Sequence, residues 1–167
     1  MQVSAAEVKE LREKTGAGVM ACRNALLEAN GDMDSAVEIL RQRGLAQAKK
    51  RANRVASQGL VETYVHAGGR IGAMVEVNCE TDFVARTDQF KGLAHDLAMQ
   101  VAAIAPTYVS SEEIPSDVEG DPKESCLLLQ PFIRDPDRTV QDIIDETMAQ
   151  VGENIVVRRF ARFELGN

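Results

Sequence analysis

One short stretch of the sequence combines an acid, a large aromatic side chain and a change of secondary-structure pattern. Strand-forming residues run up to Asn78, the segment Thr81-Asp82-Phe83-Val84 follows, and a helical pattern begins soon after. Loops between a strand and a helix often carry binding residues, and a carboxylate beside a rigid apolar ring suits insertion into another molecule. A second interpretation stays open on these residues alone: Thr81 or Asp82 caps the next helix and Phe83 packs into the core.

The other residue types that could do chemistry are few and scattered. Cys22, Cys79 and Cys126 are widely separated and have no paired spacing, so they predict neither a disulfide framework nor a zinc site. His66 and His95 are the only histidines, and no nucleophile or acid motif beside them predicts catalysis. We therefore expect no metal, no cofactor and no enzymatic activity, in a protein of a reducing compartment.

The composition is that of an ordinary globular protein with an acidic balance. The 167 residues are 44% hydrophobic and 27% charged, with a formal net charge of −7. No apolar run approaches the roughly 20 residues that a membrane helix needs. A basic cluster lies between Lys49 and Arg54, which is typical either of a nucleic-acid patch or of a solvated helix face. The acidic total favours the solvated face, so we expect no direct nucleic-acid binding and no membrane association.

The first part of the chain predicts three short helices. The pattern Ser4-Ala5-Ala6-Glu7 is a capping box that begins a helix, and Gly16 and Gly18 end it. A second helix follows from residue 19, and Asp32 can cap a third helix that stops near Gly44. We expect a bundle over residues 1–46, followed by a basic helical linker over residues 47–57.

From Gly59 the hydrophobic period changes to two, which predicts strands. Val61, Thr63 and Val65 alternate with polar residues, Gly68-Gly69 supplies a hairpin turn, and the return strand runs from Ile71 to Asn78. A continuous apolar stripe then predicts a core helix that Pro106 ends, formed by Phe90, Leu93, Ala94, Leu97, Val101 and Ile104.

The last third of the chain predicts a loop, a helix and one more strand. Residues 110–125 have the composition of an exposed loop, and the sequence Asp135-Pro136-Asp137 is typical of a turn. Thr139 can cap a helix that Gly152 ends. The final segment alternates, with one face formed by Ile155, Val157, Ala161, Phe163 and Leu165. That strand must pair with the hairpin, so the core over residues 58–167 is predicted to be α+β, with an antiparallel sheet of about three strands covered by helices.

Several motifs in order resemble those of the elongation factor Ts family. They are Thr15-Gly16-Ala17-Gly18, the hairpin pattern from His66 to Gly72, EVNCETDFVA, Gln130-Pro131-Phe132 and GENIVVRRF. The resemblance covers nearly the whole chain and implies that the N-terminal bundle is a ubiquitin-associated-like module and that the core is of the dimerisation type. It fails over roughly Ser111 to Ser125, where the family usually carries a longer, largely helical insertion.

The resemblance implies a guanine nucleotide exchange factor that binds elongation factor Tu, GDP-bound and nucleotide-free, and promotes GDP release by disturbing the Mg²⁺ and phosphate site. It assigns Phe83 as the inserting residue and Asp82 as the group that disturbs the metal site, with Thr81 and Val84 fixing the loop. Further contacts with the partner are implied for Leu11, Arg12, Met20 and His66. Leu11 also suits the core of the bundle.

Other interpretations stay open at this point. The three-helix module could serve as an interaction adaptor without exchange activity, although an adaptor needs no motif such as Thr81 to Val84. A homodimer could supply the second core-like half that longer relatives contain within one chain. The expected location is the bacterial cytoplasm or the plastid stroma.

Overall fold

A computed structural model describes residues 3–166 of the chain. Its first three helices are α1 (Ala5–Thr15), α2 (Val19–Glu28) and α3 (Met33–Arg51). The predicted helix starts are confirmed, because Ser4 and Glu7 form the capping box of α1 and the Asp32 side chain caps α3. Gly16 ends α1 in a left-handed conformation with φ of 67°. The three helices enclose a small core of their own, formed by Val8, Leu11, Cys22, Ala25, Leu26, Ala36 and Leu40.

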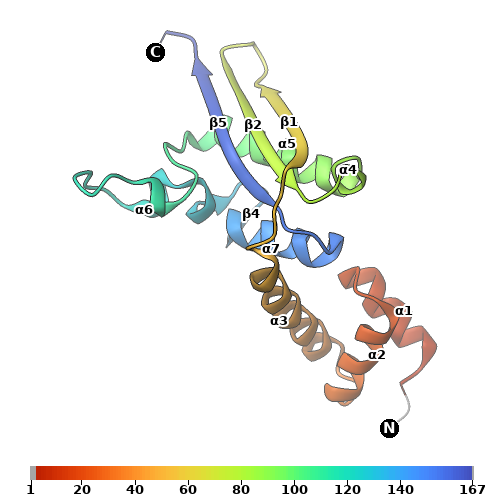
Figure 1. The fold of residues 1–167 in the computed structure, drawn as a ribbon. Helices are drawn as coiled ribbons and strands as arrows, with labels where there is room; N and C mark the ends of the chain where they lie inside the picture. The colour runs from red at the N-terminus through yellow and green to blue at the C-terminus, as the bar shows by residue number, and fades with distance from the viewer. Residues whose placement is uncertain (1–2, 167) are drawn as a thin grey trace.

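Helix α3 does not stop near Gly44, as the sequence predicted, but continues to Arg51 (Figure 1). A Cβ atom at Gly44 would lie 2.9 Å from the Cβ atom of Ala149, which belongs to helix α7 (Val140–Val151). The glycine therefore lets two helices approach each other closely and is not a helix terminator. Residue 46, the expected end of the bundle, lies inside α3, so the helical part of the basic linker is a continuation of the third helix.

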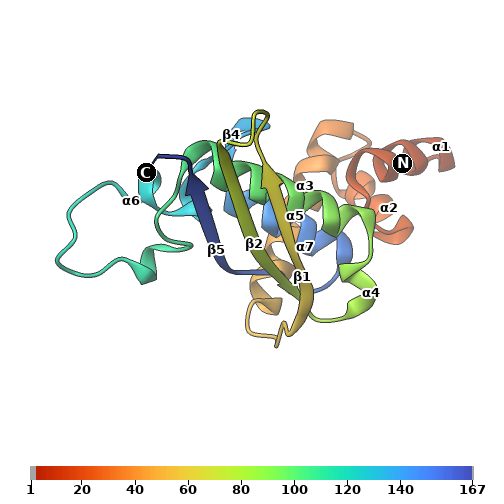
Figure 2. The ribbon, with the colours of Figure 1, turned by 90° about the horizontal axis from the view of Figure 1, so that it is seen from above.

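The core contains a three-stranded antiparallel sheet, which confirms the predicted α+β class. Strands β1 (Gln58–Val65) and β2 (Ile71–Cys79) form the hairpin, and β5 (Val156–Glu164) pairs with β2, so β2 is central. Helix α5 (Asp88–Ile104) packs on the sheet, and α7 (Val140–Val151) packs on α5 and α3. Figure 2 shows both helices behind the three strands, with the other face of the sheet uncovered.

The final strand does not keep one apolar face. Its pairing with β2 shifts between Glu76 and Val77, so that Arg159 lies opposite Glu76 while Val157 lies opposite Val77. The extra residue reverses the alternation beyond it, which is the known effect of a β-bulge. Phe160 therefore packs against the core, whereas the predicted inward residue Phe163 is 77% exposed. Ala161 and Leu165 are exposed for the same reason, although Ile155 and Val157 are buried as predicted.

The segment between α5 and α7 contains short elements that the sequence did not predict. They are η1 (Ser111–Glu113), α6 (Pro122–Ser125), η2 (Leu127–Leu129), β3 (Pro131–Phe132) and β4 (Asp135–Thr139). The predicted turn at residues 135–137 is wrong, because those residues lie in β4 and the turn is at residues 133–134. The buried side chain of Gln100 determines this geometry: it donates to the carbonyl of Pro131 at 3.0 Å and accepts from the amide of Ile133 at 2.7 Å.

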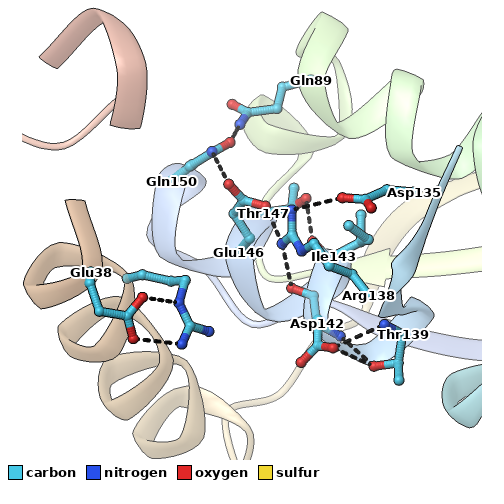
Figure 3. A network of polar contacts seen from close by, with 11 residues as sticks. Glu38, Gln89, Asp135, Arg138, Thr139, Asp142, Ile143, Glu146, Thr147 and Gln150 are labelled. Carbon is cyan, nitrogen blue, oxygen red and sulfur yellow. Dashed lines mark hydrogen bonds and ion pairs between the residues drawn. The ribbon is translucent and has the colours of Figure 1, made fainter. Parts of the chain in front are cut away.

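Helix α7 is fixed at both ends by polar contacts (Figure 3). Thr139 caps its first turn with a reciprocal capping box, as predicted. Arg138 contacts Glu146, and Gln150 in the last turn contacts Gln89 in the first turn of α5. α7 is therefore held against the elements around it on its polar side as well as through the core. Over residues 3–166, no helix is long and apolar enough to cross a membrane.

Candidate functional site

The segment from Thr81 to Val84 forms a rigid turn at the end of β2. Helix α4 (Asp82–Ala85) is a single turn, and the hydroxyl oxygen of Thr81 accepts from the amide of Val84. The carbonyl of Thr81 accepts from the thiol of Cys79 at 3.1 Å and from the amide of Ala85 at 3.3 Å. Burial, followed by the nearby Glu153 carboxylate, raises the pKa of the Cys79 thiol, so the thiol stays protonated and can donate.

The carboxylate of Glu153, just after α7, holds the same turn from a distant part of the chain. Its Oε2 atom accepts from the backbone amides of Glu80 at 3.1 Å and Thr81 at 3.0 Å. Its Oε1 atom accepts from the hydroxyl of Thr81 at 2.6 Å. The backbone amide, hydroxyl and carbonyl of Thr81 are thus all engaged, so the start of α4 has little freedom to move.

The turn divides its side chains between the core and the solvent. Val84 and Ala85 pack against the main core. Phe83 is 80% exposed, and Asp82 is exposed and forms an ion pair with Arg86 at 2.9 Å. The interpretation that Thr81 caps a helix is confirmed, whereas its companion, Phe83 packing into the core, is wrong. An exposed phenylalanine on an anchored turn is the arrangement that insertion into a partner requires.

The predicted contact residues of the N-terminal module differ in accessibility. Leu11 has no exposed surface and lies at the centre of the bundle, which supports the core interpretation for that residue. Met20 is 61% exposed at the start of α2. Arg12 is exposed beside an apolar groove of about 390 Å³. The groove is lined by Val3, Ala5, Val8, Lys9, Arg12, Val19 and Arg23.

His66 lies apart from the other predicted site residues. It follows β1 at the tip of the hairpin, and its Nδ1 atom lies 3.1 Å from the hydroxyl of Tyr64. The Thr81 turn begins at the opposite end of the same hairpin, after β2. The structure therefore does not bring His66 together with Phe83, and both could meet one partner only across a large interface. Within residues 3–166, no cluster of at least three potential ligands for a metal ion occurs.

Comparison with known proteins identifies the family. A model of the family described as Elongation factor TS matches residues 6–121. The chain belongs to the elongation factor Ts family. The elongation factor Ts of Moorella thermoacetica is 54% identical, over 98% of this chain and 96% of the relative. That of Carboxydothermus hydrogenoformans is 54% identical, over 95% of this chain and 87% of the relative. Membership of the elongation factor Ts family makes the protein a translation elongation factor.

The comparison with elongation factor Ts relatives also bears on the segment before Gln130. The alignment with the Moorella relative spans 194 positions, more than the 167 residues of this chain, so the relative has residues that this chain lacks. The family match ends at residue 121, inside the segment where the resemblance fails. Here the chain has only η1, α6 and the loop between them.

Glu153 is the part of the site that the sequence did not reveal. It lies in the GENIVVRRF motif, but nothing in its neighbourhood points to a contact with residues more than 70 positions away. The only local signal in the sequence is an acidic residue directly after a helix-ending glycine. Such a residue is usually surface or cap, so its three contacts with the Thr81 turn emerge only from the fold.

Proposed function

We propose that the protein is a guanine nucleotide exchange factor that binds elongation factor Tu·GDP and promotes the release of GDP. One observation carries the proposal: Phe83, within the family motif, is 80% exposed on a turn that is anchored at Thr81. Leaving a large ring in water costs the free protein the burial energy of that ring, and a partner pocket recovers it. Exchange of this kind makes and breaks no covalent bond.

Phe83 and Asp82 suit the release of a nucleotide that is held through a metal ion in the partner. Mg²⁺ requires near-octahedral oxygen ligands and usually retains water molecules. A ring inserted between partner helices moves the groups that order those waters, and the Asp82 carboxylate adds a negative charge nearby. Both effects weaken the binding of the metal ion. The diphosphate of GDP then loses the positive charge that balances its own. Arg86 pairs with Asp82 in the free protein and has to release it in the complex.

The effect on affinity is reciprocal. If the factor weakens GDP binding to its partner by some ratio, GDP weakens binding of the factor by the same ratio. The nucleotide-free complex is therefore the tightest one, and incoming nucleotide displaces the factor. This property lets one molecule act repeatedly on many partner molecules.

The N-terminal module provides the second contact with the partner. Arg12 and Met20 are exposed and available for direct contact, and the neighbouring groove offers an apolar surface with basic side chains at its rim. Leu11 supports this surface from inside the bundle. His66, at the far tip of the hairpin, extends the contact along the core. We place the protein in the cytoplasm, the compartment of translation in bacteria such as those of its relatives.

Release of fluorescent GDP from elongation factor Tu tests the proposal. The wild type should accelerate release at substoichiometric concentration, and Phe83→Ala should lose most of the acceleration. Val55→Ala is the matched control, because Val55 is 81% exposed and lies in the linker. Acceleration by Phe83→Ala equal to the wild type would remove Phe83 from the mechanism. Binding without acceleration by the wild type would favour the adaptor function.

We further propose a homodimer formed through the uncovered face of the sheet (Figure 2). Several exposed apolar side chains on one face of a sheet are typical of an interface. The self-complementary packing of two copies about a two-fold axis would cover it. The exposed apolar residues on or beside this face are Val61, Val65, Met74, Phe163 and Leu165.

Sedimentation equilibrium tests the homodimer. The wild type should show about twice its chain mass of 18.2 kDa, and Phe163→Glu should shift the mass toward a single chain. Val55→Glu places the same charge on an exposed valine of the linker and should leave the mass unchanged. A wild type that stays monomeric at high protein concentration contradicts this part of the proposal.

A further inference from the structure

The carboxylate of Glu153 is the long-range anchor that reaches Thr81, at the start of the turn that carries Phe83. It accepts three hydrogen bonds from the loop, two from backbone amides and one from the Thr81 hydroxyl, at 2.6 to 3.1 Å. The same hydroxyl oxygen accepts from the amide of Val84 and so begins the turn that carries Phe83. A hydroxyl that donates to a carboxylate is also a better acceptor, because hydrogen bonds in a chain polarise one another.

Glu153 is itself fixed on both sides. Gly152 ends α7 with φ of 78°, and its amide donates to the carbonyl of Met148. The next residue, Asn154, is buried, and its side chain donates to the carbonyls of Ala52 and Arg54 at 3.2 and 2.7 Å. Its backbone amide donates to Oε1 of Glu80 at 2.7 Å. Figure 3 shows the polar contacts that hold α7 just before this segment. The backbone on both sides of Glu153 is therefore held in place, and the carboxylate holds the loop from a fixed base.

We propose that Glu153 is a positioning residue for exchange, which sets the orientation of the Thr81 turn and thereby of Phe83. This proposal rests on the proposed exchange function. Phe83 can displace groups of the partner only if its ring enters from a fixed support. A mobile loop would move itself and leave the partner's groups in place. Glu153 supplies that support without touching the partner, because it is half-buried behind the turn.

Three variants separate positioning from general stability. Glu153→Ala removes all three hydrogen bonds to the loop. Glu153→Gln keeps an acceptor for the backbone amides and loses the carboxylate, so it should recover part of the effect. Glu113→Ala is the matched control: Glu113 also accepts from a backbone amide, that of Val109 at 3.0 Å, but it lies in the segment after α5, away from the turn.

The measurement is the rate of fluorescent GDP release from elongation factor Tu as a function of factor concentration. With Glu153→Ala, the limiting rate at saturation should fall about tenfold, which corresponds to about 1.4 kcal/mol in the barrier to release. The half-saturating concentration and the melting temperature should stay close to those of Glu113→Ala. Glu153→Gln should lie between Glu153→Ala and the wild type. Equal limiting rates for Glu153→Ala and Glu113→Ala would overturn the proposal.

A double variant tests whether Glu153 acts through Phe83. In a Phe83→Ala background, Glu153→Ala should cause no further loss, because the side chain that it positions is gone. If the double variant instead loses as much rate as the product of the two separate losses, Glu153 acts by another route and the proposal is overturned.

Amide hydrogen exchange of residues 79–85 in the free protein provides a readout that is independent of the partner. Glu153→Ala should speed exchange there, and Glu113→Ala should not. If the wild type fails to accelerate GDP release, the proposed function is wrong, and this readout alone decides whether Glu153 holds the loop.

Discussion

Two phenylalanines seven positions apart allow a direct test of the exposed turn. Phe83 is 80% exposed, whereas Phe90, on the inner side of α5, has no exposed surface. Fully burying a phenylalanine side chain contributes about 1.5 to 3 kcal/mol, so the buried fifth of Phe83 contributes about 0.5 kcal/mol to folding. Phe90→Ala should instead cost about 3 to 5 kcal/mol, because it also leaves a cavity. The same substitution is thus expected to have very different effects at the two sites.

Urea unfolding followed by circular dichroism measures both free energies. Phe83→Ala should leave the midpoint nearly unchanged, and Phe90→Ala should lower it strongly at a similar slope. A cost above about 1.5 kcal/mol for Phe83→Ala would mean that the ring packs against the protein in solution. The insertion mechanism would then lose its physical basis. A partner that buries the exposed four-fifths of Phe83 should gain about 1.2 to 2.4 kcal/mol, which is roughly 8- to 60-fold in affinity.

Three further substitutions test the local environment of single residues. Gly59→Ala should destabilise by about 2 kcal/mol or more, since φ is 140° and a Cβ atom would lie 2.1 Å from the carbonyl oxygen of Val77. Gly92→Ala on α5 meets no atom within 4 Å and should stabilise by about 0.5 to 1 kcal/mol in the same assay. Burial raises the pKa of Asp145, so its ionisation opposes folding as the pH rises above the ordinary value of 3.8. Asp145→Asn should therefore raise the unfolding midpoint at pH 7, and the gain should vanish near pH 3.

These predictions have clear contrary outcomes. Equal stability of the two glycine variants would mean that β1 can shift away from β2 at no cost. A gain for Asp145→Asn that persists at pH 3 would show that the carboxyl group opposes folding for a reason other than its charge. Gln141, which donates to Asp145 at 2.7 Å, can still donate to the amide oxygen of asparagine and so does not bias the comparison.

Local signals predicted the element starts well. Ser4, Asp32, Thr81 and Thr139 each cap a helix in the structure, because a cap depends only on residues within one turn of it. The three strands were also predicted, since alternation and the glycine pair are local features. The pairing of the last strand with the hairpin was predicted as well, but the register of that pairing was not. The bulge in β5 arises from pairing with β2, and one extra residue moved Phe163 from the predicted core to the solvent.

Gly44 failed as a helix terminator for a related reason. Alone in a sequence, a glycine indicates a helix end, but here its missing side chain serves the approach of α7, about 100 positions later in the chain. The candidate site likewise has one part that neighbouring residues predict and one part that they do not. The Thr81 turn was predicted from its own residues, whereas Glu153 was not, because a contact across the fold leaves no trace in the spacing of neighbours.

Helix α3 fixes the distance between the two proposed contact surfaces, one on the N-terminal module and the other at the Thr81 turn. Leu40 belongs to the core of the N-terminal module, and Ala48, two turns later, belongs to the main core. A flexible linker would only raise the local concentration of one surface near the partner after the other had bound. A continuous helix packed on α7 holds the two surfaces at a fixed separation. In the proposed mechanism, binding through the module would press Phe83 against the partner at one position. Binding energy gained at the module can then be used to displace the partner's groups, which is what exchange requires.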